Sequence, residues 1–518
     1  MPPTTRRATA KRAPASVTSR STATPAASAT PGATDGATAR RRTTAAPARS
    51  RTAGRSPSPS YQIERLTLPN GLRVVIAPDR SSPVVAVAVH YDVGFRSEPQ
   101  HRTGFAHLFE HLMFQGSENV GKAEHPKYVQ AAGGTFNGST HPDYTNYFQL
   151  LPSGALDLAL FLEADRMRAP KLTQENLENQ IAVVQEEIRV NVMNRPYGGF
   201  PWIRLPDVAY TTFPNAHNGY GAFEELQAAS LSDASSFFES YYAPGNAVLT
   251  VAGDVTVARA ISLIERHFGQ VPARTVPARP DFAEPAPTSE RRRDEIDPLA
   301  PQPAFAAGYR VPDPVSDFAA YLPYVLLTEV LTAGDASRLE KRLVQDDRLV
   351  TSIESYLGTF GDPFDQRDPL LLTLETYHPP TTSADAVLAV VDEELDRLAS
   401  DGPAEGELDR VRARLSARLF REVDDVLGRT LTLAVFELLH ADPALLNALP
   451  QKLAEVTAAQ LASAAASVRA QPRSLLVLEP GAGKPDKASK PAKSGVASKP
   501  SKTAKSAKSG KSRKGRAA

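Results

Sequence analysis

Two histidines and one glutamate come close together in the segment GFAHLFEHLMFQGS. Their order is His107-x-x-Glu110-His111, so the two imidazoles are four residues apart. On a helix this spacing places both imidazoles on one face, from which they can bind the same ion. Glu110 borders that face, where its carboxylate can accept a proton from a metal-activated water. The pattern is typical of a zinc hydrolase in which the order of the H-E-x-x-H motif is inverted.

The alternative interpretation is a histidine pair on an amphipathic surface helix. We favour the metal site because the segment is otherwise apolar, and a buried imidazole without a partner is costly. A catalytic zinc site needs a third protein ligand and one open position for water. The chain contains no cysteine, so the third ligand is His, Asp or Glu.

Glu186 and Glu187 are the candidates for the third ligand. They lie in NQIAVVQEEIRV, on a helix predicted from about Leu172 to Asn194 with Thr173 as its N-cap. The apolar positions that define the buried face of this helix are Leu177, Ile181, Val184 and Ile188. Glu187 lies toward that face and Glu186 lies toward solvent, so Glu187 is the better ligand. The alternative partner for Glu187 is a buried arginine.

These residues resemble the inverted zinc motif of the pitrilysin and mitochondrial processing peptidase family. The match includes Glu187, 76 residues after His111, and extends over roughly residues 61–480. The resemblance implies a peptidase in which His107, His111 and Glu187 hold one zinc ion per chain and Glu110 is the general base. The family also has a supporting glutamate seven residues before the third ligand. This chain has Gln180 there, as in some branches, and we assign it no catalytic role.

The segment GGTFNGST, residues 133–140, resembles the edge strand on which this family lays its substrate. The unpaired N–H and C=O groups of an edge can bind an extended peptide as an added strand. The resemblance implies substrate contacts for Thr135, Asn137 and Gly138. The alternative for Asn137 is a turn residue beside a glycine.

Active members of this family also use an arginine and a tyrosine, seven residues apart, from the second half of the molecule. The aligned positions in SRLEKRLVQDDRLVTSI are Val344 and Thr351, which lack the corresponding donor groups. We therefore expect a heterodimer with a homologous chain that supplies the Arg/Tyr pair. The other eight histidines lack ligand spacing and are expected to be structural: His90, His101, His125, His141, His217, His267, His378 and His440.

Periodicity and turn signals predict an α+β fold of two homologous α/β-sandwich domains, one half of a processing-peptidase clamshell. Strands are predicted within 61–78 around Pro69-Asn70-Gly71, at 81–94, 134–140, 144–152, 246–254 and 303–311, and twice within 351–375. Both halves end in a capped helix, a turn and an apolar strand, which suggests a duplication. The predicted boundaries are a tail at 1–58, the zinc domain at 59–270, a linker at 271–301, the second domain at 302–483 and a tail at 484–518.

The formal net charge of +1 conceals three regions of different charge. Residues 1–58 carry 11 basic side chains and one acid, residues 484–518 carry 12 and one, and the remainder carries 36 basic and 56 acidic side chains. We expect both basic tails to be disordered. No apolar run is long enough to span a membrane, and no export signal is visible, which favours the cytoplasm with export as the alternative.

Two other functions compete with peptide hydrolysis. The first is a non-catalytic scaffold within a processing complex, although such homologues usually lose zinc ligands or the base. The second is non-specific binding of nucleic acid or another polyanion through the tails.

Overall fold

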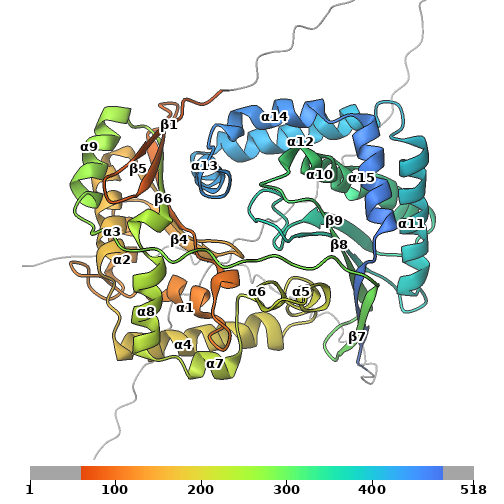
Figure 1. Cartoon of the computed structure of the whole chain (residues 1–518), viewed down its shortest axis with the longest axis horizontal. Helices are drawn as coiled ribbons and strands as arrows, with labels where there is room; N and C mark the ends of the chain where they lie inside the picture. The colour runs from red at the N-terminus through yellow and green to blue at the C-terminus, as the bar shows by residue number, and fades with distance from the viewer. Residues whose placement is uncertain (1–59, 482–518) are drawn as a thin grey trace, which may run out of the picture. The chain divides into compact units, whose positions relative to one another are not determined.

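Two β-sheets, each with helices packed on it, form residues 60–481, the part of the chain that the computed structural model describes (Figure 1). The predicted tails lie outside these residues. The first sheet has the order β1-β2-β6-β3-β5-β4. Its strands are β1 (Glu64–Thr67), β2 (Arg73–Pro78), β3 (Val84–Tyr91), β4 (Thr135–Thr140), β5 (Thr145–Pro152) and β6 (Ala247–Gly253).

The second sheet has the order β7-β11-β8-β10-β9. Its strands are β7 (Arg291–Asp297), β8 (Ala304–Arg310), β9 (Ser352–Leu357), β10 (Leu371–Tyr377) and β11 (Ser474–Pro480). In the first sheet β2 is parallel to β6, and β6, β3, β5 and β4 follow in antiparallel pairs. In the second sheet β7 is parallel to β11, and β11, β8, β10 and β9 follow in the same way. The repeated order and direction confirm the predicted pair of homologous α+β domains.

Helices fill the connections between these strands. Those before β7 are α1 (Phe105–Leu112), α2 (Glu124–Ala131), α3 (Leu156–Arg168), α4 (Gln174–Ile188), α5 (Arg204–Ala209), α6 (Phe213–Ala216), α7 (Phe223–Gln227), α8 (Leu231–Tyr241) and α9 (Val257–Phe268). Those after β8 are α10 (Phe318–Thr332), α11 (Ala384–Asp401), α12 (Glu407–Asp424), α13 (Val426–His440), α14 (Leu445–Glu455) and α15 (Ala458–Ala470). Within the described residues, no helix is both long and apolar enough to cross a bilayer.

The predicted strands all form, and the predicted hairpin is β1–β2. Its turn is also tied to α9, because Asn70 Nδ2 donates to the carbonyls of Phe268 and Val271 at 2.8 and 3.0 Å. The segment predicted as a linker, 271–301, has no helix or strand up to residue 290, but Arg291–Asp297 form β7. Exposed and less exposed residues alternate along β7, and most of them are charged because β7 is an edge strand. This polarity gave the segment the composition of a linker.

Both faces of the first sheet are buried. Val74 and Val85 face a core that includes α1, α3 and α4. Val75, Ala86 and Val248, which point to the other face, join a core shared with the second domain. Helix α13 packs across β3 and β6 on that face. The first domain contributes to the second in return, since Leu205 and Val208 of α5 pack on β8 and β11.

A buried ion network joins the two domains. Arg96 donates to Asp143 Oδ1 at 2.5 Å and to the carbonyl of Arg367 at 3.2 Å. The backbone N–H of Arg367 donates to Asp143 Oδ2 at 2.7 Å, and its guanidinium reaches Asp92 Oδ1 at 2.9 Å. Arg96 and Asp143 are almost fully buried, so each depends on the other for its charge compensation.

Replacing Asp143 with Ala leaves the Arg96 guanidinium buried without its counter-ion. We expect the free energy of unfolding to fall by about 3–5 kcal/mol, the usual cost of removing one partner of a buried pair. The matched control is Asp385→Ala, because Asp385 accepts from Arg292 at 2.8 Å but is largely exposed. That change should cost less than about 1 kcal/mol in the same urea titration. An equal loss of unfolding free energy in both variants would contradict the conclusion that Arg96 depends on Asp143 for charge compensation.

Candidate metal centre

Helix α1 begins at a buried carboxylate that binds its first turn. Glu98 accepts from the backbone N–H of Gly104 at 2.8 Å and of Ala106 at 2.7 Å. These N–H groups have no partner inside the helix, so Glu98 takes the place of a helix cap. His217 Nε2 lies 3.3 Å from the same carboxylate. The first turn of α1 is therefore fixed from two loops, and His107 lies on it.

His107, His111 and Glu187 come together with their ligand atoms facing one another. The two Nε2 atoms are 3.3 Å apart, and Glu187 Oε2 lies 3.5 Å from His107 Nε2 and 3.6 Å from His111 Nε2. Ligands that lie about 2.1 Å from a tetrahedral ion are about 3.4 Å from each other. The triangle therefore has the size that a zinc ion requires, and the donor set of two imidazoles and one carboxylate fits that ion.

The apolar positions of helix α4 explain why Glu187, and not Glu186, reaches the two histidines. Leu177, Ile181, Val184 and Ile188 are all buried. Glu187 lies on the same side, with 20% of its side chain exposed, whereas Glu186 is 65% exposed and pairs with Arg189 at 3.1 Å. Thr173 caps the helix as predicted, and the predicted extension to Asn194 continues as a wider π-helical turn over Arg189–Met193.

The surroundings of His107 favour the neutral form of its imidazole. Burial and the nearby His111 lower the pKa of His107 to about 3. Burial also lowers the pKa of His111, but the Glu187 and Glu110 carboxylates and Gln180 outweigh it and raise that pKa above its usual value. Gln180 thus lies against His111. Within the described residues, the buried Nδ1 of His107 has no hydrogen-bond partner.

Glu110 lies beside the triangle and is held by the edge strand β4. Its Oε2 accepts from Thr140 Oγ1 at 2.8 Å. Burial raises the pKa of Glu110, while His111 and the Thr140 hydroxyl act in the opposite direction. Gly138 permits the close approach of α1 to β4, because a Cβ there would lie 3.1 Å from Glu110 Cγ and 3.2 Å from the carbonyl oxygen of Asn146. Glu110 is thus a half-buried carboxylate between α1 and the edge strand β4.

The residues expected to touch substrate all lie on β4. This strand ends the first sheet, with β5 on one side and no partner strand on the other among residues 60–481. Thr135 and Asn137 are exposed, and Gly138 is buried against α1. Side chains alternate along a strand, so Thr135 and Asn137 point away from the face on which Gly138 and Thr140 meet Glu110.

Three residues beside the centre were not predicted from the sequence. Thr140 holds Glu110, and its place two residues after Gly138 is the signal that puts it on the same face. The ring of Tyr220 lies 5.1 Å from that of His107. His141 follows β4 directly, and its Nδ1 lies 3.1 Å from Asp365 Oδ2 of the second domain. Tyr220 and His141 reach the site through loop folding, which leaves no periodic pattern.

Two models of one peptidase family match the sequence. The model described as insulinase (peptidase family M16) matches residues 73–197, and the model described as the peptidase M16 inactive domain matches residues 228–415. Zinc protease PqqE of Helicobacter pylori is 28% identical over 372 residues, 70% of this chain and 82% of that protein. The β subunit of the mitochondrial processing peptidase of Blastocladiella emersonii is 25% identical over 317 residues, 59% of this chain and 65% of that protein.

A crystal structure of a protease from Helicobacter pylori is similar to this chain with a TM-score of 0.74 and 27% identity. The similarity covers 81% of this chain and all of that one.

Replacing Glu187 with Ala removes one corner of the triangle. We expect the affinity for zinc to fall by more than about 100-fold, because even outer-shell partners of a metal are worth 10- to 100-fold. The matched control is Glu186→Ala, one residue earlier on the exposed side of α4, which should keep full affinity. Competition with a chelator measures both constants. A loss of zinc in the Glu186 variant and not in the Glu187 variant would contradict this assignment.

Proposed function

The chain belongs to peptidase family M16, and we propose that it is a zinc-dependent metalloendopeptidase acting on unfolded peptides or flexible protein segments. The observation that carries the proposal is the triangle of 3.3, 3.5 and 3.6 Å between the three ligand atoms, with Glu110 beside it. One zinc ion held by His107, His111 and Glu187 supplies a Lewis acid that lowers the pKa of water toward 7.

Glu110 acts as the general base in this proposal. Thr140 occupies its Oε2, so Oε1 remains to accept the proton of the attacking water. The same oxygen then delivers that proton to the amide nitrogen of the leaving segment. Burial raises the pKa of Glu110, which makes its carboxylate a stronger base for the first of these steps.

The free edge of β4 is the proposed substrate platform. A peptide added there as a strand exchanges main-chain hydrogen bonds with β4 and lies about 4.8 Å from it. Gly138 and the exposed Thr135 and Asn137 lie along this edge, which supports their proposed contacts with the substrate. Main-chain pairing needs extended segments, and this requirement favours unfolded or flexible substrates.

A homologous partner chain completes the proposal. Val344 packs against the core of the second domain, and Thr351 Oγ1 donates to the carbonyl of Tyr377 at 2.9 Å. Neither side chain carries a donor aimed at the transition state, and one relative is named as a subunit of a processing peptidase. We propose that the partner supplies the missing arginine and tyrosine.

Replacing Glu110 with Gln keeps the size of the side chain and removes the base. We expect the rate of peptide cleavage to fall by about 100- to 10,000-fold. The zinc content of the variant should stay at one ion per chain, measured by mass spectrometry of the metal. Full cleavage by this variant would place the base elsewhere, and cleavage by the zinc-free chain would rule out the metallopeptidase.

The partner proposal predicts weak activity for the purified chain alone. Adding a homologue that carries the Arg/Tyr pair should raise kcat/KM by about 100-fold or more, since one transition-state donor is worth that much. The control is the same homologue with both residues changed to Ala. Full activity of the lone zinc-loaded chain would contradict the heterodimer proposal and would still agree with the peptidase proposal.

A further inference from the structure

A row of aromatic rings leads away from the metal centre. The ring of Tyr220 lies 5.1 Å from that of metal-ligand candidate His107, and the ring of Trp202 lies 5.5 Å from that of Tyr220. Each ring is tilted against its neighbour, at 80° and 50°, as aromatic pairs prefer. Trp202 is the only tryptophan in the sequence. It thus lies two ring contacts from His107.

The row then turns back to the edge strand through the second domain. Phe360 lies 5.8 Å from Trp202 and 5.5 Å from His141, which directly follows β4. Phe360 is at the tip of a loop between Gly358 and Gly361, both in the left-handed region with φ of 77° and 87°. Its side chain is 46% exposed. Phe360 and Trp202 thus form a wall between Tyr220 beside α1 and His141 beside β4.

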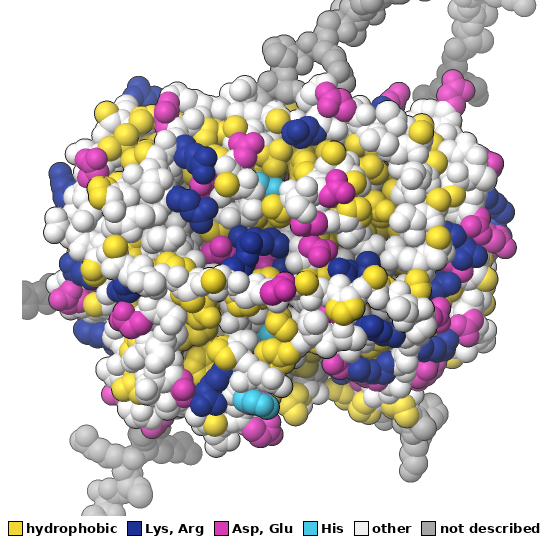
Figure 2. All heavy atoms as spheres, viewed as in Figure 1, with side chains coloured by type: hydrophobic (Ala, Val, Ile, Leu, Met, Phe, Trp, Pro, Cys, Tyr) yellow, Lys and Arg dark blue, Asp and Glu magenta, His cyan; other side chains and the backbone are white. Residues whose placement is uncertain are grey.

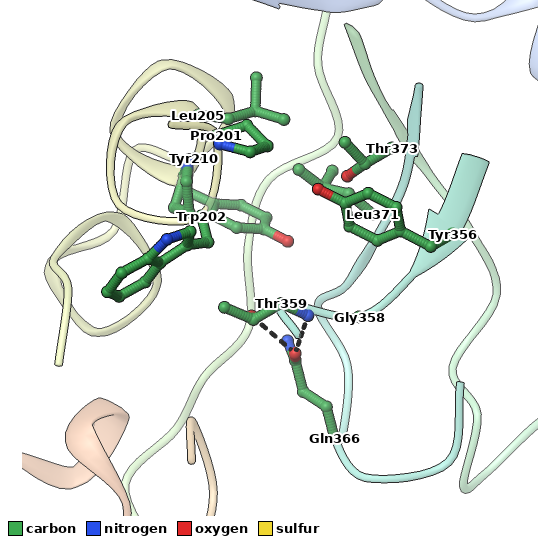
Figure 3. A pocket seen from close by; sticks show the side chains of 11 residues that line it. Pro201, Trp202, Leu205, Tyr210, Tyr356, Gly358, Thr359, Gln366, Leu371 and Thr373 are labelled. Atoms are coloured by element: carbon green, nitrogen blue, oxygen red, sulfur yellow. Dashed lines mark hydrogen bonds between the residues drawn. The ribbon is translucent and has the colours of Figure 1, made fainter. Parts of the chain in front are cut away.

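A hollow opens behind Trp202, between the segment that begins α5 and strands β9 and β10 (Figure 3). The rings of Tyr210 and Tyr356 reach into it from opposite sides, and Leu205 and Leu371 are also part of its wall. Thr359 closes the bottom by donating to Gln366 Oε1 at 2.9 Å. The space that a water-sized sphere can reach in this open hollow is about 30 Å³, which admits a methyl group or a water molecule. A larger group would lie over Trp202 and insert only its tip.

The lining of this hollow carries no charged side chain. A lysine, arginine or carboxylate that entered it would lose water without gaining an ionic partner. A large apolar group would instead cover the half-buried ring of Trp202 and the exposed ring of Phe360 and remove them from water. The chemistry of the surface therefore selects an apolar occupant.

We propose that Trp202 and Phe360 form a subsite for a bulky apolar side chain of the substrate, aromatic or branched aliphatic. The inference rests on the proposed peptidase function and adds a preference to it. An extended peptide advances about 3.3 Å per residue. The two ring steps from His107 therefore place the subsite within about three residues of the cleaved bond. Main-chain pairing on β4 supplies affinity, and this wall supplies selection between side chains.

The sole tryptophan allows binding to be read without catalysis. The full chain carrying Glu110→Gln, loaded with zinc, is titrated with ten-residue alanine-serine peptides in which one Phe, Leu, Arg or Ala is moved through every position. We expect saturable changes in tryptophan fluorescence for the Phe and Leu peptides, with Kd values at least tenfold below those of their Ala counterparts. Phe360→Ala should reduce this ratio to less than threefold while zinc content stays at one ion per chain.

The second measurement is the rate of peptide cleavage by the chain with Glu110 intact. The kcat/KM for Phe or Leu peptides should exceed that for Ala peptides by about 10- to 100-fold at one position, the usual value of a hydrophobic contact. Trp202→Ala and Phe360→Ala should remove most of this preference. The matched control is Tyr128→Ala on α2, an aromatic side chain of similar exposure, 43%, outside the row. It should leave the preference unchanged.

Each failure has its own signature. Equal cleavage of Phe and Ala peptides, a preference for Arg, or a preference that survives both wall variants overturns the subsite. Absence of cleavage with every peptide, also after addition of the homologue that carries the Arg/Tyr pair, counts against the peptidase; selective fluorescence changes of Glu110→Gln would then still support the subsite.

Discussion

The buried pair of Arg96 and Asp143 fixes all three parts of the candidate site. Arg96 lies two residues before Glu98, the carboxylate that caps α1. Asp143 lies between the end of β4 and the start of β5. Through the carbonyl and the N–H of Arg367, the same pair binds the loop of the second domain that carries Phe360. The helix of the candidate metal centre, the proposed substrate edge and the aromatic wall are thus all tied to one buried ion pair, and a buried network of this kind rigidifies the segments that it joins.

The duplicated sheets use their equivalent edges in different ways. Strands β4 and β9 occupy the same place in the repeated order. One face of β4 lies against α1 and Glu110 at Gly138, which has no side chain to keep them apart. Strand β9 instead carries Tyr356, a large ring that lines the hollow behind Trp202. One copy of the edge thus provides main-chain groups, and the other provides side chains.

Local patterns in the sequence were sufficient to bring the three candidate metal ligands together and to predict most elements. His107, His111 and Glu187 lie on two helices whose apolar positions orient them, so helical periodicity predicted the triangle. The contacts of α13 with the first sheet, of α5 with the second and of Phe360 with His141 join segments far apart along the chain. No local pattern predicts such contacts, because they join apolar surfaces of two different domains. The prediction that His141 is structural agrees with its hydrogen bonds to Ser139 and Asp365, although the sequence does not show that it lies near the candidate site. Strand β7 was predicted as linker because an exposed edge strand has the polarity of a loop.

The charges on the four sheet edges differ in a way that affects solubility as well as binding. Edges β1, β7 and β9 carry ionised side chains, such as Glu64, Arg293 and Glu354, which discourage pairing with a strand of another molecule. Strand β4, TFNGST, carries none. The molecule therefore protects three edges against aggregation and leaves one edge chemically unguarded. Any unfolded chain in the same compartment, including a misfolded copy of this one, meets its least repulsive docking edge beside Glu110.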